Sequence, residues 1–329
     1  MKKQNKIYDC LIIGAGPAGL SAAIYLKRAS VDVAVLEMGP IGGKTNYISI
    51  VNNYLGLNNS FGPDLAMKFY EHAQANKIEF IADEVTTVTK SKDLFVITSQ
   101  DDEIYYAKSI IVASGSLEKK LDLPKADIFE HKGVSYCAIC DGPLYKNKDV
   151  AVIGGGNSAL EEALYLSRIV NKVYLIHRRD EFRADEGIVN EVKKQKNIEV
   201  LYSSLVTALF GDNKLEAIEI NGKNRIDVSA LFPYIGLIPN TNFLKFDNLC
   251  NKDGYILINN NGETIVEGLF AAGDVANGPM KQIVTASADG AIASKGVLNY
   301  LQNKKWFLIA IRMFYLMLLI IIIVLSIIV

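Results

Sequence analysis

Two cysteines separated by two residues are the part of this sequence with the most recognisable chemistry. The segment YCAICDG contains Cys137 and Cys140, and the other two cysteines, Cys10 and Cys250, lie far from this pair. Two thiols at this spacing can close a small reversible disulfide, and the spacing commonly lowers the pKa of one thiol so that a thiolate is available. Asp141, directly after the pair, either carries a proton to or from a leaving thiolate or is a polar turn residue. The pair predicts thiol–disulfide redox chemistry.

A structural zinc site is the alternative interpretation of the cysteine pair. Structural zinc requires four ligands, which usually come from a second pair of cysteines or histidines. Neither Cys10 nor Cys250 has a cysteine or histidine partner at metal-binding spacing. The sequence therefore favours a redox pair, and no metal site is predicted.

The first of two glycine-rich turns follows an apolar, strand-like run at residues 7–13. It has the sequence GAGPAG and supplies Gly14, Gly16 and Gly19. Such glycines permit a tight turn, let the backbone approach a pyrophosphate, and let the next helix pack closely while its amino terminus faces the phosphates. Glu37 ends the next strand, where a carboxylate can accept a hydrogen bond from a ribose 2′-hydroxyl. The turn predicts a dinucleotide site.

A second turn of the same type carries a different charge at its ribose-reading end. The segment GGGNSA supplies Gly154, Gly156, Asn157, Ser158 and Ala159. At the position equivalent to Glu37 the sequence has His177, followed by Arg178, Arg179 and, a turn later, Arg183. Cationic groups at this point suit a ribose 2′-phosphate better than a hydroxyl, although most charge runs are only solvated surface. We therefore expect the second site to prefer NADP to NAD.

The elements around both turns are those expected of βαβ units. After the strand at 7–13, an apolar-periodic stretch at 20–26 predicts a helix, and residues 31–37 predict a second strand. Residues 148–179 repeat the order of strand, glycine turn, helix and strand. The sequence therefore predicts an α/β protein with two Rossmann-like dinucleotide-binding domains.

The order of the remaining elements indicates that one domain is inserted into the other. Residues 84–113 alternate apolar and polar side chains and end in a buried-strand pattern, and the later segment GLFAAGDV reads as another strand and turn before a helix-like run from Gln282 to Leu301. A chain of 329 residues suits two domains. We expect a first domain of residues 1–117 and 247–303, and an inserted domain of residues 118–246 that carries the cysteine pair.

The charge of the protein and its amino-terminal sequence bear on its partners and its location in the cell. The formal net charge is -1, and acidic and basic residues are interspersed, so no broad basic face for nucleic acid is predicted. The start MKKQNKIYDC enters a strand without an apolar signal region. A reducing cytoplasm is therefore the expected location.

The carboxyl end is almost wholly apolar from Trp306 to Val329. The stretch after Arg312 is uncharged and could cross roughly 25 Å as a helix with a rise of about 1.5 Å per residue. Lys304, Lys305 and Arg312 lie on its amino-terminal side and would keep the catalytic part on the cytoplasmic face. Residues 306–329 therefore predict a membrane anchor; the alternatives are a helix docked on a partner and an extension without function.

The ordered set GAGPAG, CAICDG, GGGNSA, HRRDEFR and GLFAAGDV resembles the low-molecular-weight thioredoxin reductases over residues 7–302. The resemblance implies FAD in the first domain, NADPH in the inserted one, and reduction of thioredoxin or a thioredoxin-like protein. It implies that Cys140 faces the flavin, that Cys137 attacks the disulfide of thioredoxin, and that Asp141 is the acid. It also implies a homodimer whose domains swivel about the segments near 117 and 246.

The same resemblance assigns further FAD contacts outside the first glycine turn. They are Gly42, Gly43, Asn53, Gly273 and Asp274. Two features depart from the family pattern. Lys44 and Thr45 stand where many members have glutamine and a hydrophobic residue, and the apolar tail is not usual in the family.

Four other functions compete with this one. Ferredoxin or flavodoxin NADP reductases share the two domains but lack the cysteine pair, and peroxide-linked reductases carry an extra amino-terminal domain, whereas here the first fold begins at residue 7. The acceptor can also be another small dithiol protein. A non-catalytic, membrane-tethered redox-sensing module is the alternative from a different class, and bound cofactors without turnover would indicate it.

Overall fold

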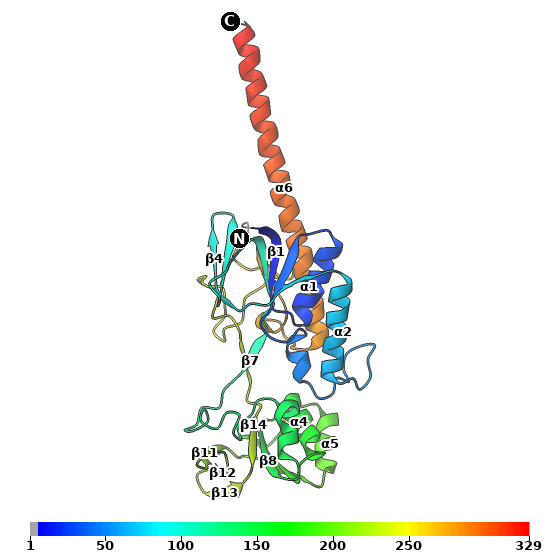
Figure 1. Ribbon diagram of the computed structural model, residues 1–329, viewed down its shortest axis with the longest axis vertical. Helices are drawn as coiled ribbons and strands as arrows, with labels where there is room; N and C mark the ends of the chain where they lie inside the picture. Colours follow the sequence, from blue (N-terminus) through cyan, green and yellow to red (C-terminus); the bar gives the residue numbers. More distant parts are fainter. Residues whose placement is uncertain (1–5, 329) are drawn as a thin grey trace. The chain divides into compact units, whose positions relative to one another are not determined.

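The computed structural model describes the backbone of residues 6–328 and the side chains as far as Lys305. The chain forms two compact units (Figure 1). Unit 1 comprises Met1–Thr45, Leu65–Gly115 and Pro239–Val329, and unit 2 comprises Asn46–Asp64 and Ser116–Ile238. The expected boundaries of the inserted domain were 117/118 and 246/247. The segment Asn46–Asp64, expected in the first domain, groups with unit 2; it has no strand of its own, only a bridge between Val51 and Ser60.

Unit 1 contains a sheet in the order β3-β2-β1-β6-β5-β4, with β16 also paired to β6. Its parallel strands are β1 (Ile7–Ile13), β2 (Val33–Leu36), β3 (Glu79–Ile81), β6 (Ile104–Val112) and β16 (Leu269–Ala271), and its antiparallel strands are β4 (Val85–Ser91) and β5 (Leu94–Ser99). One edge of β6 is shared: β5 pairs with Ile104–Ala107, and β16 pairs with Ile110–Val112. The late segment GLFAAGDV thus contributes β16 to the sheet of unit 1.

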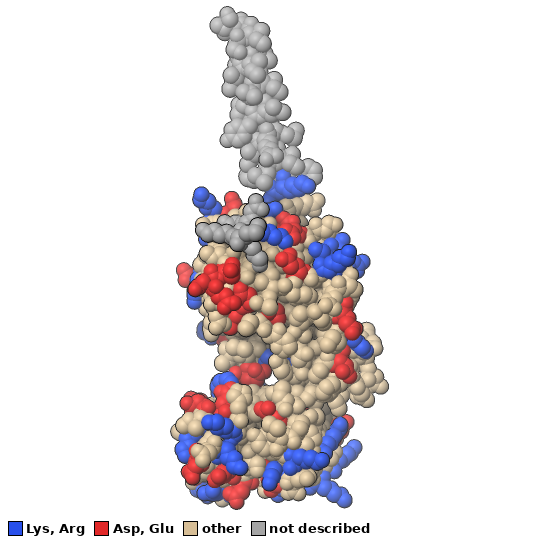
Figure 2. All heavy atoms as spheres, viewed as in Figure 1, with Lys and Arg blue, Asp and Glu red and all other residues tan. Residues whose placement is uncertain are grey.

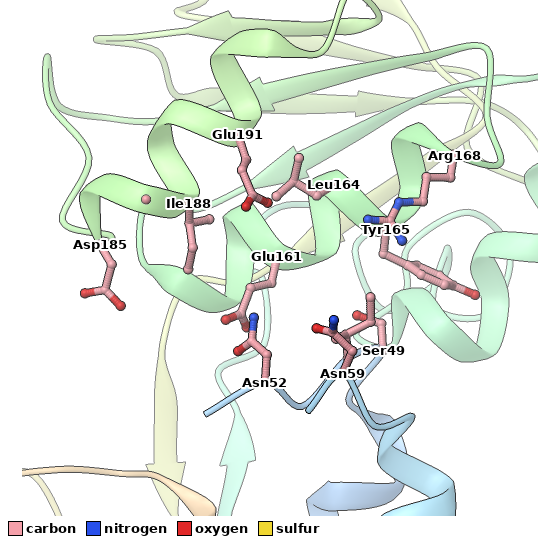
Figure 3. A pocket seen from close by; sticks show the side chains of 12 residues that line it. Ser49, Asn52, Asn59, Glu161, Leu164, Tyr165, Arg168, Asp185, Ile188 and Glu191 are labelled. Carbon is pink, nitrogen blue, oxygen red and sulfur yellow. The ribbon is translucent and has the colours of Figure 1, made fainter. Parts of the chain in front are cut away.

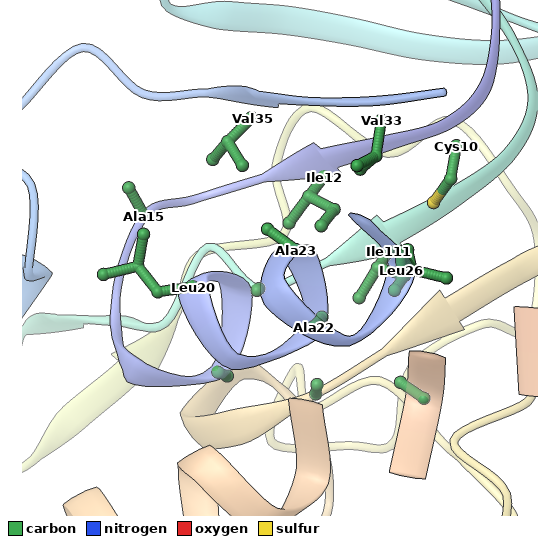
Figure 4. Close-up of a cluster of buried hydrophobic side chains, with 14 of the residues drawn as sticks. Cys10, Ile12, Ala15, Leu20, Ala22, Ala23, Leu26, Val33, Val35 and Ile111 are labelled. Carbon is green, nitrogen blue, oxygen red and sulfur yellow. The ribbon is translucent and has the colours of Figure 1, made fainter. Parts of the chain in front are cut away.

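The helices of unit 1 are α1 (Pro17–Arg28), α2 (Gly62–Ala75) and α6 (Ile283–Ile328), with short 3-10 turns η1 (Gly43–Tyr47) and η3 (Gly273–Val275). Leu20 and Leu26 of α1 belong to the same buried cluster as Ile12, Val33 and Ile111 of the sheet (Figure 4). On its other side α1 packs against α6 at very short range. A Cβ added to Gly290 of α6 would lie 2.0 Å from the carbonyl oxygen of Ala18. Glycine and alanine at this contact therefore let the two helices approach closely and fix the amino terminus of α1.

Unit 2 contains a parallel sheet in the order β10-β9-β8-β14 and a separate antiparallel sheet of β11, β12 and β13. Its elements are α3 (Ala138–Asp141), η2 (Gly142–Tyr145), β8 (Asp149–Ile153), α4 (Asn157–Ser167), β9 (Lys172–Ile176), α5 (Glu186–Lys194), β10 (Ile198–Leu201), β11 (Val206–Phe210), β12 (Ala217–Ile220), β13 (Asn224–Asp227) and β14 (Ala230–Pro233). The predicted α/β class with two Rossmann-like sheets is confirmed.

Two short strands lie where the chain passes from one unit to the other. They are β7 (Ser116–Glu118) and β15 (Leu237–Pro239), and they pair with each other. Next to them, the N–H of Asn240 donates to the carbonyl of Gly115 at 3.1 Å. The two connections are thus joined by backbone hydrogen bonds.

Surface charge is mixed in both units. On the face drawn in Figure 2, lysine and arginine residues alternate with aspartate and glutamate residues. The predicted membrane anchor, residues 306–329, lies outside the residues whose side chains are described. Among those that are described, no helix is long and apolar enough to cross a bilayer.

Candidate active site

The cysteine pair lies at the start of a single helical turn in unit 2. Cys137 is the residue before α3, with an extended backbone, and its sulfur is bonded to that of Cys140; their Cα atoms are 5.3 Å apart. The Sγ of Cys137 also accepts a hydrogen bond from the backbone N–H of Cys140 at 3.2 Å. Cys140 is exposed and Cys137 is half-buried. The two sulfurs thus form the disulfide that the spacing predicts, at a place that solvent reaches.

Side-chain hydroxyl groups of two nearby residues accept hydrogen bonds from the backbone of this turn. Ser135 Oγ accepts the N–H of Cys137 at 3.2 Å, and the hydroxyl of Tyr234 accepts the N–H of Ala138 at 3.2 Å. Ala138 is buried in the core of unit 2. Burial raises the pKa of Tyr234 strongly, so its hydroxyl stays protonated. No local motif pointed to Tyr234, which comes from the residue after β14, or to Ser135, which lies two residues before Cys137 and outside the CxxC motif.

Asp141 ends α3 directly beside Cys140. Its backbone N–H donates to the carbonyl of Cys137 at 3.1 Å, and its side chain is half-buried. Burial and, after it, the charge of Asp141 raise the pKa of the Tyr145 phenol. The carboxylate is therefore close to the pair and reachable by solvent, as a proton carrier must be.

The first glycine turn connects β1 to α1, and each of its glycines meets a different requirement. Gly14 has φ +106°, and a Cβ there would lie 2.3 Å from the carbonyl oxygen of Ala113. A Cβ on Gly19 would lie 1.9 Å from the carbonyl oxygen of Gly14. A Cβ on Gly16 would meet nothing within 4 Å. Gly14 and Gly19 are thus required by the fold, whereas Gly16 leaves open space at the amino terminus of α1, where a pyrophosphate would lie.

Glu37 and the glycine pair after it converge on this turn. Glu37 Oε2 accepts the N–H of Ala15 at 2.8 Å, and the N–H of Gly42 donates to the carbonyl of Ala15 at 2.8 Å. A Cβ on Gly43, where φ is +54°, would lie 3.1 Å from Gly16 Cα. The carboxylate is thus oriented at the end of β2, and Gly43 adds a second stretch of bare backbone beside the open position.

Gly273 and Asp274 reach the same end of α1 from η3. A Cβ on Gly273 would lie 2.9 Å from Ala18 Cβ, and its N–H donates to Asp289 Oδ2 at 3.3 Å. Burial raises the pKa of Asp274 and of Asp289, while Lys281 opposes the shift in both. Asp289 and Lys281 were not predicted, since neither belongs to a recognisable motif; the helix packing brings them here.

The residues of unit 1 fit an FAD molecule. The space beside Gly16 is a cradle that a side chain would fill, and the neighbouring Thr45 is buried with its Oγ1 unpartnered among the described residues. A buried hydroxyl without a partner is costly unless another group satisfies it. Asn53 is the exception among the predicted contacts: it is exposed and belongs to the segment that groups with unit 2. Its contact with FAD stays a prediction.

The second glycine turn connects β8 to α4 and repeats the pattern of the first. A Cβ on Gly154 would lie 2.5 Å from Ala159 Cβ, and a Cβ on Gly156 would meet nothing within 4 Å. Asn157 uses its amide to join the starts of two helices, because it donates to Asp185 Oδ2 at 2.7 Å and accepts the N–H of Asp185 at 2.8 Å. Ser158 is exposed at the start of α4. The turn thus leaves room for a phosphate beside Gly156.

The basic cluster after β9 divides into two kinds of residue. The side chains of Arg178, Arg179 and Arg183 are exposed, and within the described part of the chain no carboxylate lies at ion-pair distance from them. His177, in contrast, is 5% exposed. The three guanidinium groups are free to bind an anion, and His177 is enclosed by protein.

A pocket of unit 2 lies between α4, α5 and the segment Asn46–Asp64, and none of the predicted site residues lines it. Figure 3 shows Glu161, Tyr165 and Glu191 among the side chains around it. Glu162 is the next residue of α4 after Glu161. Burial and then the charge of Glu161 raise the pKa of Glu162 to about 8, while hydrogen bonds from Ser49 act to lower it. The residues that line this pocket come from three stretches of the chain, 49–59, 161–168 and 185–191, so no local sequence motif predicts it.

A CxxC disulfide joined to one of two dinucleotide folds defines the class of flavin-linked disulfide oxidoreductases. The pattern of one family, described as "Pyridine nucleotide-disulphide oxidoreductase", matches residues 8–290.

Comparison with individual proteins identifies the family within this class. The chain is 42% identical to a thioredoxin reductase of Mycoplasmopsis pulmonis over 305 residues, which is 91% of this chain and 99% of the relative. Thioredoxin reductase of Lactococcus lactis matches with a TM-score of 0.87 and 35% identity, covering 90% of this chain and 99% of that one. The enzyme of T. acidophilum gives a TM-score of 0.84 and 36% identity, over 91% and 99%. The chain belongs to the low-molecular-weight thioredoxin reductase family, whose members use FAD and NADPH.

Proposed function

We propose that this protein is a thioredoxin-disulfide reductase that passes electrons from NADPH through FAD and the Cys137–Cys140 pair to a protein disulfide. The observation that carries the proposal is the solvent-reachable disulfide beside Asp141, in the unit that also holds the second glycine turn. Bound FAD supplies the relay of two electrons between a nicotinamide and this disulfide.

Unit 1 would hold the FAD. Gly14 and Gly19 shape the turn, and Gly16 and Gly43 leave backbone exposed to the pyrophosphate. Glu37, oriented by Ala15, accepts from ribose hydroxyls, and Asp274 accepts from the ribityl chain. Gly42, Gly273 and Asn53 complete the proposed set.

Unit 2 would hold the NADPH. The open position at Gly156 takes the pyrophosphate at the start of α4, and Arg178, Arg179 and Arg183 take the 2′-phosphate. Three exposed guanidinium groups suit a dianionic phosphate and would gain nothing from a neutral hydroxyl. This arrangement supports NADPH over NADH.

The two thiols have separate tasks in the exchange. Reduction of the Cys137–Cys140 disulfide takes two electrons and leaves two thiols. The Cys137 thiolate attacks one sulfur of the partner's disulfide, which forms a mixed disulfide and releases the other partner sulfur as a thiolate. The Cys140 thiolate then attacks Cys137, which restores the internal disulfide and frees the second partner sulfur. Asp141 gives a proton to the departing thiolate.

Thioredoxin is the proposed partner, and another small thioredoxin-like dithiol protein is the alternative. We also propose a homodimer, and a swivel of the two units about the connections that β7 and β15 form. The family relationship supports both proposals.

The proposed location is the cytoplasm, with the catalytic units tethered to the cytoplasmic face of a membrane by residues 306–329. The apolar sequence of this tail supports the tether, and Lys304 and Lys305 support the orientation. Fractionation of cells that express the full chain or a chain ending at Lys305 tests it. Full-length protein in the soluble fraction would reject the tether without affecting the enzymatic proposal.

Turnover tests the enzymatic proposal. The full-length protein, loaded with FAD, is supplied with NADPH, thioredoxin and a disulfide dye, and thiol release is followed. We expect release that depends on both NADPH and thioredoxin, and none with Cys140→Ser. Equal release by the Cys140→Ser protein would refute the route through the pair, and bound cofactors without any release would favour the non-catalytic alternative.

A further inference from the structure

The segment from His177 to Arg183 folds back onto the second glycine turn at a single residue, Gly155. The N–H of Arg183 donates to the carbonyl oxygen of Gly155 at 2.7 Å. The imidazole ring of His177 lies directly against the same residue, because a Cβ added to Gly155 would lie 2.2 Å from the ring's Cε1 atom. Both ends of the segment are therefore fixed to the turn that would hold the pyrophosphate.

Contacts within unit 2 occupy Nε2 and one face of the His177 ring, and the side chain is buried. Its Nε2 lies 2.9 Å from the carbonyl oxygen of Glu181, and since a carbonyl only accepts, this nitrogen carries the proton. The ring of Phe182 lies 5.5 Å away, centroid to centroid, and that of Tyr202 lies 5.0 Å beyond it. With 5% of its surface exposed, His177 has little left to offer a ligand.

The three arginines of the segment differ from His177, because their side chains are exposed to solvent. Their backbones are held by the contacts of His177 and Arg183 with Gly155, whereas their side chains are exposed. We propose that His177 is a positioning residue: it holds the loop in the shape that presents Arg178, Arg179 and Arg183 to the 2′-phosphate of NADPH, and does not bind the phosphate itself. This inference rests on the proposed NADPH site and revises the role that the sequence suggested for His177.

The charges around the ring agree with this role. Burial lowers the pKa of His177, the carbonyl of Glu181 opposes the shift, and the three guanidinium groups lower it further. The ionisable groups that influence the ring are Arg178, Arg179 and Arg183, all cationic. A neutral imidazole can serve as a clamp, whereas a charge-assisted bond from His177 to the phosphate would need the imidazolium form, which the lowered pKa disfavours.

Binding of 2′,5′-ADP and 5′-AMP to the full-length protein, measured by calorimetry, tests the inference without requiring turnover. We expect the wild type to bind 2′,5′-ADP at least about tenfold more tightly than 5′-AMP, as phosphate–guanidinium bonds predict. His177→Gln should keep this preference, because the glutamine amide can donate to the Glu181 carbonyl in place of Nε2. His177→Ala and Gly155→Ala, which remove or displace the clamp, should each lose about tenfold in affinity for 2′,5′-ADP.

Arg179→Gln is the matched comparison, since it removes a proposed phosphate ligand and leaves the clamp intact. If His177→Gln lost as much preference as Arg179→Gln, His177 would be a ligand and the inference would be overturned. It would be overturned as well if the preference of the wild type rose on acidification from pH 8 to pH 6 and that of His177→Gln did not. A wild type without preference for 2′,5′-ADP would instead overturn the proposed NADPH site, on which the inference depends.

Discussion

The hydroxyl of Tyr234 lies 3.2 Å from the backbone nitrogen of Ala138, the first residue between the two cysteines. Tyr234 follows β14 at the edge of the parallel sheet, so this bond ties the redox turn to the core of unit 2. Tyr234 is half-buried against the core of unit 2, and its backbone carbonyl oxygen would lie 2.7 Å from a Cβ on Gly154. One residue thus supports both the disulfide and the second glycine turn.

Tyr234→Phe should therefore destabilise the protein and slow thiol exchange. The change leaves the N–H of Ala138 without its acceptor, and an unsatisfied buried donor costs about 1–3 kcal/mol. Urea unfolding gives the loss of stability, and the dye assay gives the rate. Tyr25→Phe is the control, since Tyr25 is 52% exposed and should lose nothing. Equal midpoints for the two variants would show that the bond to Ala138 contributes nothing.

Substitutions in the first glycine turn should separate folding from flavin binding. Gly16→Ala adds a methyl group to open space, so the apoprotein should keep its unfolding midpoint. The same methyl group should block the site of the pyrophosphate, so the protein should lose its flavin. Gly19→Ala places a methyl group 1.9 Å from a carbonyl oxygen and should lower the midpoint as well. Flavin absorbance per polypeptide and thermal unfolding measure the two effects. A yellow Gly16→Ala protein with full occupancy would contradict the proposed FAD site.

Replacement of Arg178 and Arg179 by glutamine should change the preference between nicotinamide cofactors. Each guanidinium–phosphate bond is worth about tenfold or more in affinity, so KM for NADPH should rise by at least about tenfold. KM for NADH, which has no 2′-phosphate, should change little. Steady-state kinetics with both cofactors measures this, and equal effects on the two would defeat the assignment of these arginines.

Glu162 should make stability depend on pH in an unusual direction for a carboxyl group. Its pKa is about 8 in the folded protein, above the ordinary value of 4.5, so the folded state binds more protons between these values. The contribution is fully present below about pH 4.5 and is lost as pH rises through 8, at no more than about 1.4 kcal/mol per pH unit. Chemical unfolding at pH 5 to 9 measures it, and Glu162→Gln should flatten the decline. An identical decline in both proteins would contradict this origin.

The sequence predicted the parts of the site whose chemistry is encoded by local spacing. Short motifs contain the turn glycines, the cysteine pair and the strand ends at Glu37 and His177. Where a close backbone approach requires glycine, the sequence has glycine, so these positions can be recognised from the motif alone. Tyr234, Asp289 and Glu162 were missed because each acts through a neighbour from a distant part of the chain. The burial of His177 was missed for the same reason: composition shows a charge cluster, whereas packing decides which of its members faces solvent.

The electron route through the cysteine pair is tested most directly by identifying the sulfurs that NADPH reduces. The FAD-loaded, full-length protein is treated without oxygen with one equivalent of NADPH, its free thiols are alkylated, and the labelled cysteines are mapped by mass spectrometry. The proposed route predicts two new labels, on Cys137 and Cys140, and none on Cys10, whose pKa burial raises to about 12. Cys250 is a free, half-buried thiol and can be labelled with or without NADPH, so only labels that depend on NADPH count. A disulfide that remains closed while NADPH is oxidised, or new NADPH-dependent labels elsewhere than on Cys137 and Cys140, would contradict the route.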